Sequence, residues 1–537
     1  MTISIWPASL SILFFASILV LPLLRYFPVR QLDEGFYAYP AFLISTGEHP
    51  YRDFYLGYTP GKTYLLALLF KLFGPSLFTA RWYYALVTVF LSFEIVWLTY
   101  LILHNVPLAW LSGALFLLSL FPRKELYYIT AVETGMFSDR TAIALLFMIT
   151  AILAARTQSL LLFFLAGTLL TLTLFFAQEA GIWAFVSSFV YFLCGTRGSA
   201  LEEIPPFFAG ATALLVLILL VARKLEIPVK RIFYECFKEI LVLGSGSCRR
   251  PYPSLFSTLP FRLTAGDMKD FFKNRLRFFV HYLRYYLPLF VYPVALFFLI
   301  SGALDGGIEN RERALLLPLV YGTFSFFFLY SWPDYSHIVR ALPVQIPVTP
   351  FVLLKSFEIL THNETPIYEI GFSLYTLLFF ATLWLYDSFY GVQTYVAELS
   401  EKKGKVFLNE NGQIYLEKKY YQKISSLLSF ITEKTKPGEK IFVGPADPLL
   451  YFLAKKKSDV YLKSFLPFNP PHYQQQAVTA LQNSPVKWII YNREQDQCNF
   501  FPNGAMFPRF APMLYSYLQN EYSKAFEVEG YDVYKIK

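Results

Sequence analysis

Two adjacent carboxylates, Asp33 and Glu34, follow the first apolar run of the sequence and begin a polar, aromatic segment marked by Gly and Pro. A carboxylate is costly to hold near hydrocarbon, so an acidic pair at the edge of an apolar run is a candidate functional site. One of the two can act as a general base that accepts the proton of an attacking hydroxyl. The alternative is a pair of solvated acids where the chain leaves a membrane, and the residue types alone leave both interpretations open.

Three cations follow the acidic pair in the sequence, Lys62, Arg81 and Arg140. Arg81 equally suits an interfacial anchor at the start of a helix. The neighbouring residues Arg52 and Asp53 are expected to form a local ion pair that braces the segment rather than to take part in chemistry.

Further acids follow in the segment 122–138 and just after it, namely Glu133 and Asp139, with Arg140 next in sequence. These side chains could bind a sugar or a phosphate. Asp139 also stands where the N-cap of the next helix is expected, which is the structural alternative. The pair Gln178 and Glu179 lies between two apolar runs and could line the same cavity.

A third polar cluster consists of Asp334, His337 and Arg340, at the start of another apolar run. These residues could bind sugar hydroxyls or phosphate. They could equally cap the helix that follows, which several prolines are expected to bend.

The composition indicates a membrane protein. Of the 537 residues, 55% are hydrophobic and 19% aromatic, and several stretches approach the roughly 20 apolar residues that span a bilayer. The formal net charge of +9 predicts anionic partners, which in a membrane are lipid phosphates; no basic helix or nucleic-acid motif points to nucleic acid.

The four cysteines form neither a metal-binding pattern nor a dense disulfide framework. Cys236 and Cys248 could pair if their segment faces an oxidising compartment, although spacing alone does not fix disulfide geometry. The first apolar run, Ile3 to Leu24, lacks a basic start and a small-residue cleavage site, so it is expected to be a retained helix.

Hydropathy predicts a mainly α-helical, polytopic membrane module over residues 1–390 with about eleven transmembrane helices. The predicted spans are 4–25, 82–103, 106–121, 139–155, 159–177, 180–194, 205–222, 284–303, 313–331, 339–357 and 369–388. If the N-terminus is cytoplasmic, the connections 26–81, 122–138 and 223–283 and the C-terminal segment lie outside. The Lys and Arg distribution does not decide this orientation, because the outer connections are also basic.

Beyond residue 390 the composition becomes polar. Lys440 to Val443 and Val486 to Tyr491 are predicted strands, Pro448 to Ala454 a helix, and Ala525 to Tyr534 a hairpin. Alternating strands and helices predict a small soluble α/β domain over 391–537.

The segment 30–82 resembles the GT-C class of integral-membrane glycosyltransferases, specifically the bacterial branch related to protein O-mannosyltransferases and lipid A aminoarabinose transferases. The matching features are the acidic pair, the motifs PYRDF and YTPGK, and FGPSLFTAR before the next span. The resemblance implies the GT-C fold, an active site and C-terminal domain on the extracytoplasmic face of the cell membrane, and transfer of a sugar from a polyprenyl-phosphate donor. The acceptor is a lipid, a glycan or a protein.

By this resemblance Asp33 matches the catalytic base of an inverting transfer, with Glu34 beside it. The leaving group would be a polyprenyl phosphate, and Lys62, Arg81 and Arg140 are the candidate cations to meet its charge. Lys62 falls near a lysine that meets the donor phosphate in related enzymes, but those carry Lys-Pro-Pro where this chain has Pro60-Gly61-Lys62-Thr63. A further acid in the second outer loop is a recurrent feature of the family, and Glu133 or Asp139 would fill that place.

No His, Asp and Glu set has metal-ligand spacing, so no cofactor is expected. A divalent cation held by Asp33, Glu34 and a donor phosphate stays open. Two other functions also remain: a transporter or flippase of a lipid-linked saccharide, and a non-catalytic membrane scaffold. A transporter favours internal repeats and ionisable residues at the membrane midplane, and the sequence shows no repeat and only Glu94 near a midplane.

Overall fold

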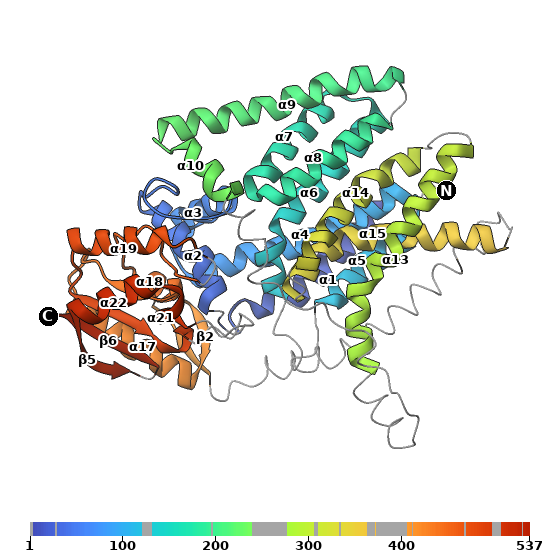
Figure 1. The fold of residues 1–537 in the computed structure, drawn as a ribbon. Helices are drawn as coiled ribbons and strands as arrows, with labels where there is room; N and C mark the ends of the chain where they lie inside the picture. The colour runs from blue at the N-terminus through green and yellow to red at the C-terminus, as the bar shows by residue number, and fades with distance from the viewer. Residues whose placement is uncertain are drawn as a thin grey trace, which may run out of the picture. The chain divides into compact units, whose positions relative to one another are not determined.

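A computed structural model describes residues 4–26, 29, 31–120, 131–194, 197–238, 276–305, 310–331, 335–361, 371, 405–410, 412–466, 469–496, 506–528 and 530–537 (Figure 1). The chain forms two compact units. The first comprises residues 1–23, 83–217 and 250–401, and the second comprises residues 24–82, 218–249 and 402–537.

The first unit is built from long apolar helices. They are α1 (Ile5–Val20), most of α4 (Leu77–Leu103), α5 (Val106–Ser119), α6 (Ala131–Thr157), α7 (Leu160–Phe176), α8 (Gln178–Leu193), most of α9 (Arg197–Lys224), α13 (Leu276–Asp305), α14 (Asn310–Ser331) and α15 (Tyr335–Thr361). Polar caps separate consecutive helices: the side chains of Asn105 and Ser159 accept backbone N–H bonds at the starts of α5 and α7.

Four of these helices contain stretches long and apolar enough to cross a membrane, counted over the described residues: Leu77–Leu103, Thr134–Thr157, Glu202–Lys224 and Tyr285–Leu304. Large apolar side chains of α9 are exposed, among them Leu217 and Leu220. Such a surface suits lipid better than water, and the chain is a membrane protein. Each of the first ten predicted spans overlaps a helix. The eleventh, 369–388, falls almost wholly outside the described residues, so the count of eleven stays a prediction.

The N-cap predicted at Asp139 is wrong. Helix α6 begins at Ala131, so Asp139 lies in its third turn, and residues 131–138, expected in a loop, are helical. Hydropathy places the start too late because the first two turns of α6 carry Glu133 and small or polar residues, which lower the local apolar signal.

Small residues bring α7 and α9 into close contact (Figure 1). A Cβ added at Gly167 would overlap the backbone carbonyl of Phe207, and one added at Gly210 would overlap that of Phe164. The Thr171 hydroxyl donates to the carbonyl of Ala211 across the same contact at 2.9 Å. Close backbone approach through Gly and Thr is how helices associate in lipid, where no hydrophobic force drives them together.

Replacing Gly210 with Leu is therefore expected to lower the thermal unfolding temperature of the protein in detergent or nanodiscs, because the added side chain must push α7 and α9 apart. The matched control is Ala209→Leu on the same helix, where the side chain is exposed. Equal unfolding temperatures for the two variants would show that the α7–α9 contact is not formed.

The second unit combines the segment after α1 with the C-terminal residues. Its N-terminal part contains α2 (Gln31–Ser45) and α3 (Gly61–Phe73), and α10 (Val229–Phe233) is followed by a π-helical turn, Tyr234–Lys238. The C-terminal part contains β1 (Lys405–Leu408), β2 (Ile414–Glu417), α17 (Lys418–Lys434), β3 (Phe442–Gly444), α18 (Pro448–Ala454), α19 (His472–Asn483), β4 (Trp488–Asn492), α20 (Arg493–Asp496), α21 (Phe507–Phe510), α22 (Pro512–Glu521), β5 (Tyr522–Val528) and β6 (Tyr531–Ile536).

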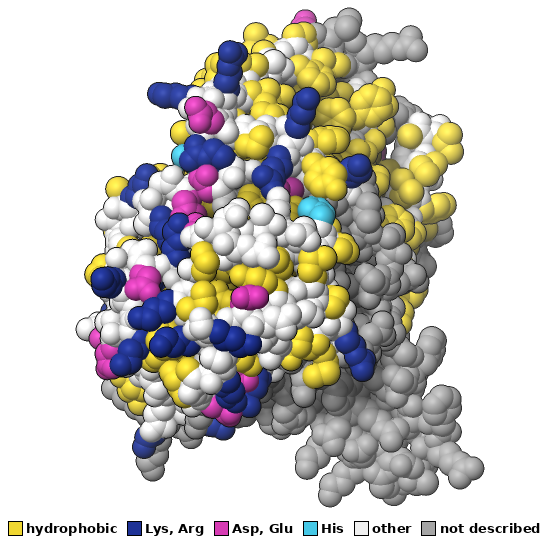
Figure 2. All heavy atoms as spheres, turned by 60° about the vertical axis from the view of Figure 1, so that its left-hand side comes forward, with side chains coloured by type: hydrophobic (Ala, Val, Ile, Leu, Met, Phe, Trp, Pro, Cys, Tyr) yellow, Lys and Arg dark blue, Asp and Glu magenta, His cyan; other side chains and the backbone are white. Residues whose placement is uncertain are grey.

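The C-terminal strands form a four-stranded sheet of order β3-β4-β6-β5, in which β3 and β4 are parallel and the other pairs antiparallel, and a separate β1–β2 hairpin. The buried strand β4 and helices α19 and α22 share one apolar core, which includes Ile489, Leu481 and Leu514. On the face in Figure 2, basic side chains are interspersed with acidic ones. The extent of a separate domain over 391–537 stays a prediction.

Helix α2, which carries Asp33 and Glu34, packs directly on α18 from the C-terminal residues. A Cβ at Gly35 would overlap the backbone of Leu449. One and two turns further along α2, Tyr39 stacks on Tyr451 with ring centroids 4.9 Å apart, and Phe42 meets Phe452 edge to face. The position of α2 therefore depends on residues more than 400 positions away in the sequence.

Candidate active site

The acidic pair occupies the first turn of α2, where negative side chains are favoured by the helix dipole. Glu34 is buried, and both of its oxygens bind the fully buried guanidinium of Arg81, with Nε–Oε1 at 2.7 Å and Nη2–Oε2 at 3.0 Å. Arg81 also donates to the carbonyl of Leu24 at 3.2 Å. By binding both Glu34 and the carbonyl of Leu24, Arg81 connects the start of α2 to the segment that precedes it.

Asp33 differs from its neighbour in being partly exposed. Successive helical residues point about 100° apart, so Asp33 lies on a different side of α2 from Glu34. Tyr37, one helical turn further along, lies on the same side of α2 as Asp33. The ammonium of Lys62, a buried residue at the start of α3, lies 3.6 Å from the centroid of the Tyr37 ring. The fold therefore brings the cation Lys62 to the side of α2 that carries Asp33.

The expected local ion pair between Arg52 and Asp53 is confirmed, with Nε–Oδ1 at 3.0 Å and Nη2–Oδ2 at 2.8 Å. Arg52 also donates to the carbonyl of Leu225 at 2.9 Å, and Asp53 accepts the His49 N–H. Burial raises the pKa of the Asp53 carboxyl, but these hydrogen bonds outweigh it, and the pKa is lowered overall. The pair braces the loop between α2 and α3.

The first unit holds a second group of charged residues. The Tyr83 hydroxyl donates to Asp139 Oδ2 at 2.9 Å, and Arg140 forms an ion pair with Glu179 in the first turn of α8. The Arg340 guanidinium lies 4.9 Å from the Phe137 ring centroid, and its backbone carbonyl accepts the Thr141 hydroxyl. Helices α6, α8 and α15 therefore bring together Asp139, Arg140 and Arg340, as well as Glu179, which was expected from the sequence only as a possible lining residue.

Three predicted site residues are not fully described. Glu133 lies in α6 and His337 in α15, but their side chains are outside the described part of the structure, as is the whole of Asp334. Cys248 is outside it too, while Cys236 is buried with its Sγ 3.4 Å from the Tyr51 hydroxyl. Among the described residues, no group of three or more His, Cys, Asp or Glu side chains is placed to hold a metal ion. The divalent cation considered above stays a prediction.

Similar solved structures come from membrane glycosyltransferases. ArnT from Cupriavidus metallidurans bound to undecaprenyl phosphate has a TM-score of 0.53 and 14% identity, covering 99% of this chain and 97% of that one. The oligosaccharyltransferase AglB from Archaeoglobus fulgidus, in complex with an inhibitory peptide and a dolichol-phosphate, has a TM-score of 0.50 and 13% identity, covering 98% and 74%. No family model and no curated protein matches the sequence. The structural likeness over nearly the whole length of the chain shows that this protein has the GT-C fold.

Proposed function

We propose that the protein is a glycosyltransferase that moves a sugar from a polyprenyl-phosphate donor to a hydroxyl of a lipid, glycan or protein acceptor. The observation that carries the proposal is the arrangement on α2. The carboxylate of Glu34 binds the guanidinium of Arg81. Asp33 is partly exposed, and it lies on the side of α2 where the ammonium of Lys62 packs against the Tyr37 ring. The solved structures of similar fold that hold a polyprenyl phosphate support this donor class.

The reaction is a single displacement. The acceptor hydroxyl gives its proton to the Asp33 carboxylate as its oxygen attacks the anomeric carbon. The bond from that carbon to the phosphate oxygen breaks, and its electron pair leaves with the polyprenyl phosphate. Attack opposite the leaving group inverts the anomeric carbon. The ammonium of Lys62 stabilises the negative charge that develops on the phosphate.

The remaining charged groups take supporting roles in this proposal. Arg81 positions α2 through Glu34, and Asp139, Arg140 and Arg340 are proposed to bind phosphate or sugar groups of a substrate. The proposal places the active site and an α/β domain formed by the C-terminal residues on the extracytoplasmic side of the cell membrane, which eleven helices span.

The test is sugar transfer by the purified full-length protein in nanodiscs made with native lipid extract. Radiolabelled polyprenyl-phosphate sugars are supplied as a panel, with and without EDTA, and empty nanodiscs are the control. Label is expected to pass from the polyprenyl-phosphate fraction to a new product, which identifies the acceptor. If no donor gives transfer while the protein remains folded, the enzyme proposal is wrong and the transporter and scaffold functions gain support. Loss of transfer in EDTA alone would reveal a required divalent cation.

A further inference from the structure

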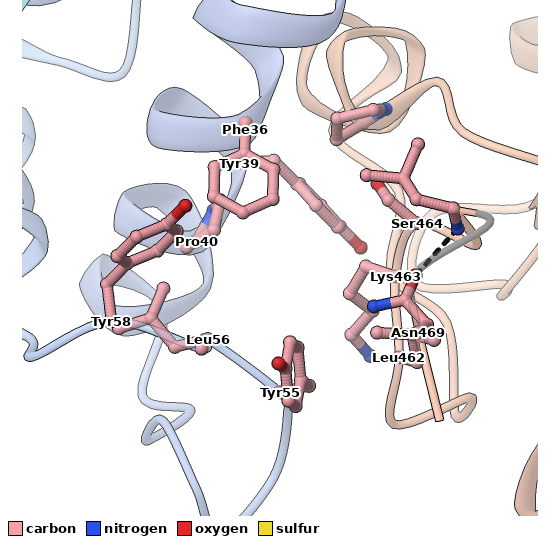
Figure 3. A pocket seen from close by; sticks show the side chains of 13 residues that line it. Phe36, Tyr39, Pro40, Tyr55, Leu56, Tyr58, Leu462, Lys463, Ser464 and Asn469 are labelled. Carbon is pink, nitrogen blue, oxygen red and sulfur yellow. Dashed lines mark hydrogen bonds between the residues drawn. The ribbon is translucent and has the colours of Figure 1, made fainter. Parts of the chain in front are cut away.

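A cavity of about 90 Å³ in the second unit adjoins α2 (Figure 3). Its walls come from α2, from residues 55–58 and, in the C-terminal part, from Pro448, residues 462–464, Leu466 and Asn469. Among the described residues, four aromatic side chains line it, Phe36, Tyr39, Tyr55 and Tyr58. The rings of Phe36 and Tyr58 meet edge to face with centroids 6.0 Å apart. Since a water needs about 10–15 Å³ of such space, the cavity holds roughly six to nine water-sized groups, comparable to one sugar ring.

The cavity also presents neutral polar groups. The hydroxyl of Tyr39, a residue with 0% exposure, has no hydrogen-bond partner within the described part of the chain. Asn469 uses its side-chain oxygen to accept the Leu466 N–H at 2.6 Å, which leaves its NH₂ group to donate elsewhere. Ser464 lines the same space. A buried hydroxyl without a partner costs free energy, so a ligand that bonds to it is favoured.

Lys463 is the one cation among the described residues that line the cavity, and it is already engaged. Its ammonium donates to the carbonyl of Ser458 at 2.6 Å. Burial lowers the pKa of Lys463 to about 8, while the nearby acids Glu48 and Asp459 act in the opposite direction. Because the carboxylates of Glu48 and Asp459 offset the charge of Lys463, the cavity does not require an anionic ligand. Its aromatic faces and neutral donors suit a hydroxylated, uncharged ring.

We propose that this cavity binds one saccharide ring of the acceptor, an inference that rests on the proposed function. Aromatic side chains pack against the apolar face of a sugar ring, while the Tyr39 hydroxyl and the Asn469 amide bond to its hydroxyls. Phe36 follows Asp33 by three residues, so the two lie on neighbouring parts of one helix face, about 4.5 Å apart along the axis. A sugar ring in the cavity therefore lies beside the base that would take a proton from the acceptor.

The test measures binding separately from transfer. Methyl glycosides of common hexoses, pentoses and amino sugars are titrated into the full-length protein in nanodiscs, with saturation-transfer NMR as the readout. At least one is expected to bind. The double variant Tyr39→Phe, Asn469→Ala is expected to bind it about tenfold more weakly, because two hydrogen bonds are lost. Tyr58→Leu, at a residue that is 41% exposed, removes an aromatic wall with little effect on folding and should also weaken binding.

A further variant serves as the control. Tyr292→Phe likewise removes a buried hydroxyl that lacks a partner among the described residues, but in α13 of the first unit, and should bind the glycoside normally. If the normal protein binds no methyl glycoside, if the cavity variants bind equally well, or if only long-chain alkyl glycosides bind, the proposal is overturned. If only the enzyme proposal is wrong, the glycoside still binds but no sugar is transferred, so the two failures can be distinguished.

Discussion

Replacing Asp33 with Asn is expected to lower the rate of sugar transfer by about 100-fold or more, the usual effect of removing a general base. The amide is close in shape to the carboxylate but does not accept the proton of the acceptor hydroxyl. Because Asp33 is partly exposed in the first turn of α2, the substitution should leave folding nearly unchanged. The measurement is the initial rate of label transfer, with the thermal unfolding temperature recorded on the same preparation.

The neighbouring acid provides the matched control. Glu34→Gln makes the same chemical change one residue away, but on a side chain whose two oxygens bind Arg81. This variant should lose stability, and any active fraction that remains folded should still transfer sugar. If Asp33→Asn transfers sugar normally, Asp33 is not the base. If only Glu34→Gln loses transfer while both variants stay folded, the base is Glu34, and if neither loses transfer, both acids are excluded.

The difference between Asp33 and Glu34 shows what could and could not be predicted from the sequence. Composition and the edge of the first apolar run were enough to single out Asp33 and Glu34, because the cost of a charge near hydrocarbon is a local property. They could not tell the two acids apart. That distinction depends on Arg81, which is 47 positions away in sequence and meets Glu34 only in the folded chain.

Helix positions were similarly predictable where they depend on local hydropathy, and less so where polar residues begin a helix, as in α6. Contacts between side chains of different helices could not be predicted from the sequence. Arg140 finds its partner in Glu179, 39 residues later, and no pattern in the sequence ties the two together. The same holds for Lys62 and Tyr37, which become neighbours only when α3 packs against α2.

The largest gap concerns the C-terminal residues. Strands and helices could be anticipated there from short apolar runs, but not that α18 would pack on α2 through Gly35 and Tyr39. In this fold the C-terminal part helps to hold the helix that carries the candidate base and supplies one wall of the adjacent cavity. Its removal should therefore disturb the candidate active site itself, beyond any loss of acceptor contacts.

Replacing Arg81 with Met is expected to lower the free energy of unfolding by about 3–5 kcal/mol, because it leaves the buried Glu34 carboxylate without its partner. The unfolding of the protein in detergent, followed by circular dichroism during denaturant titration, measures the effect. Arg52→Met is the matched control, since it breaks an ion pair whose Arg and Asp side chains are about one-third exposed and should cost less than about 1 kcal/mol.

The double variant Glu34→Gln, Arg81→Met separates the lost ion pair from lost packing. With the charge of Glu34 removed, no uncompensated carboxylate remains buried, so the double variant should be more stable than Arg81→Met alone. An Arg81→Met protein as stable as the normal one would mean that Glu34 and Arg81 do not meet as described. In that case Glu34 would be as good a candidate base as Asp33, since the burial of Glu34 against Arg81 and the partial exposure of Asp33 are what distinguish them.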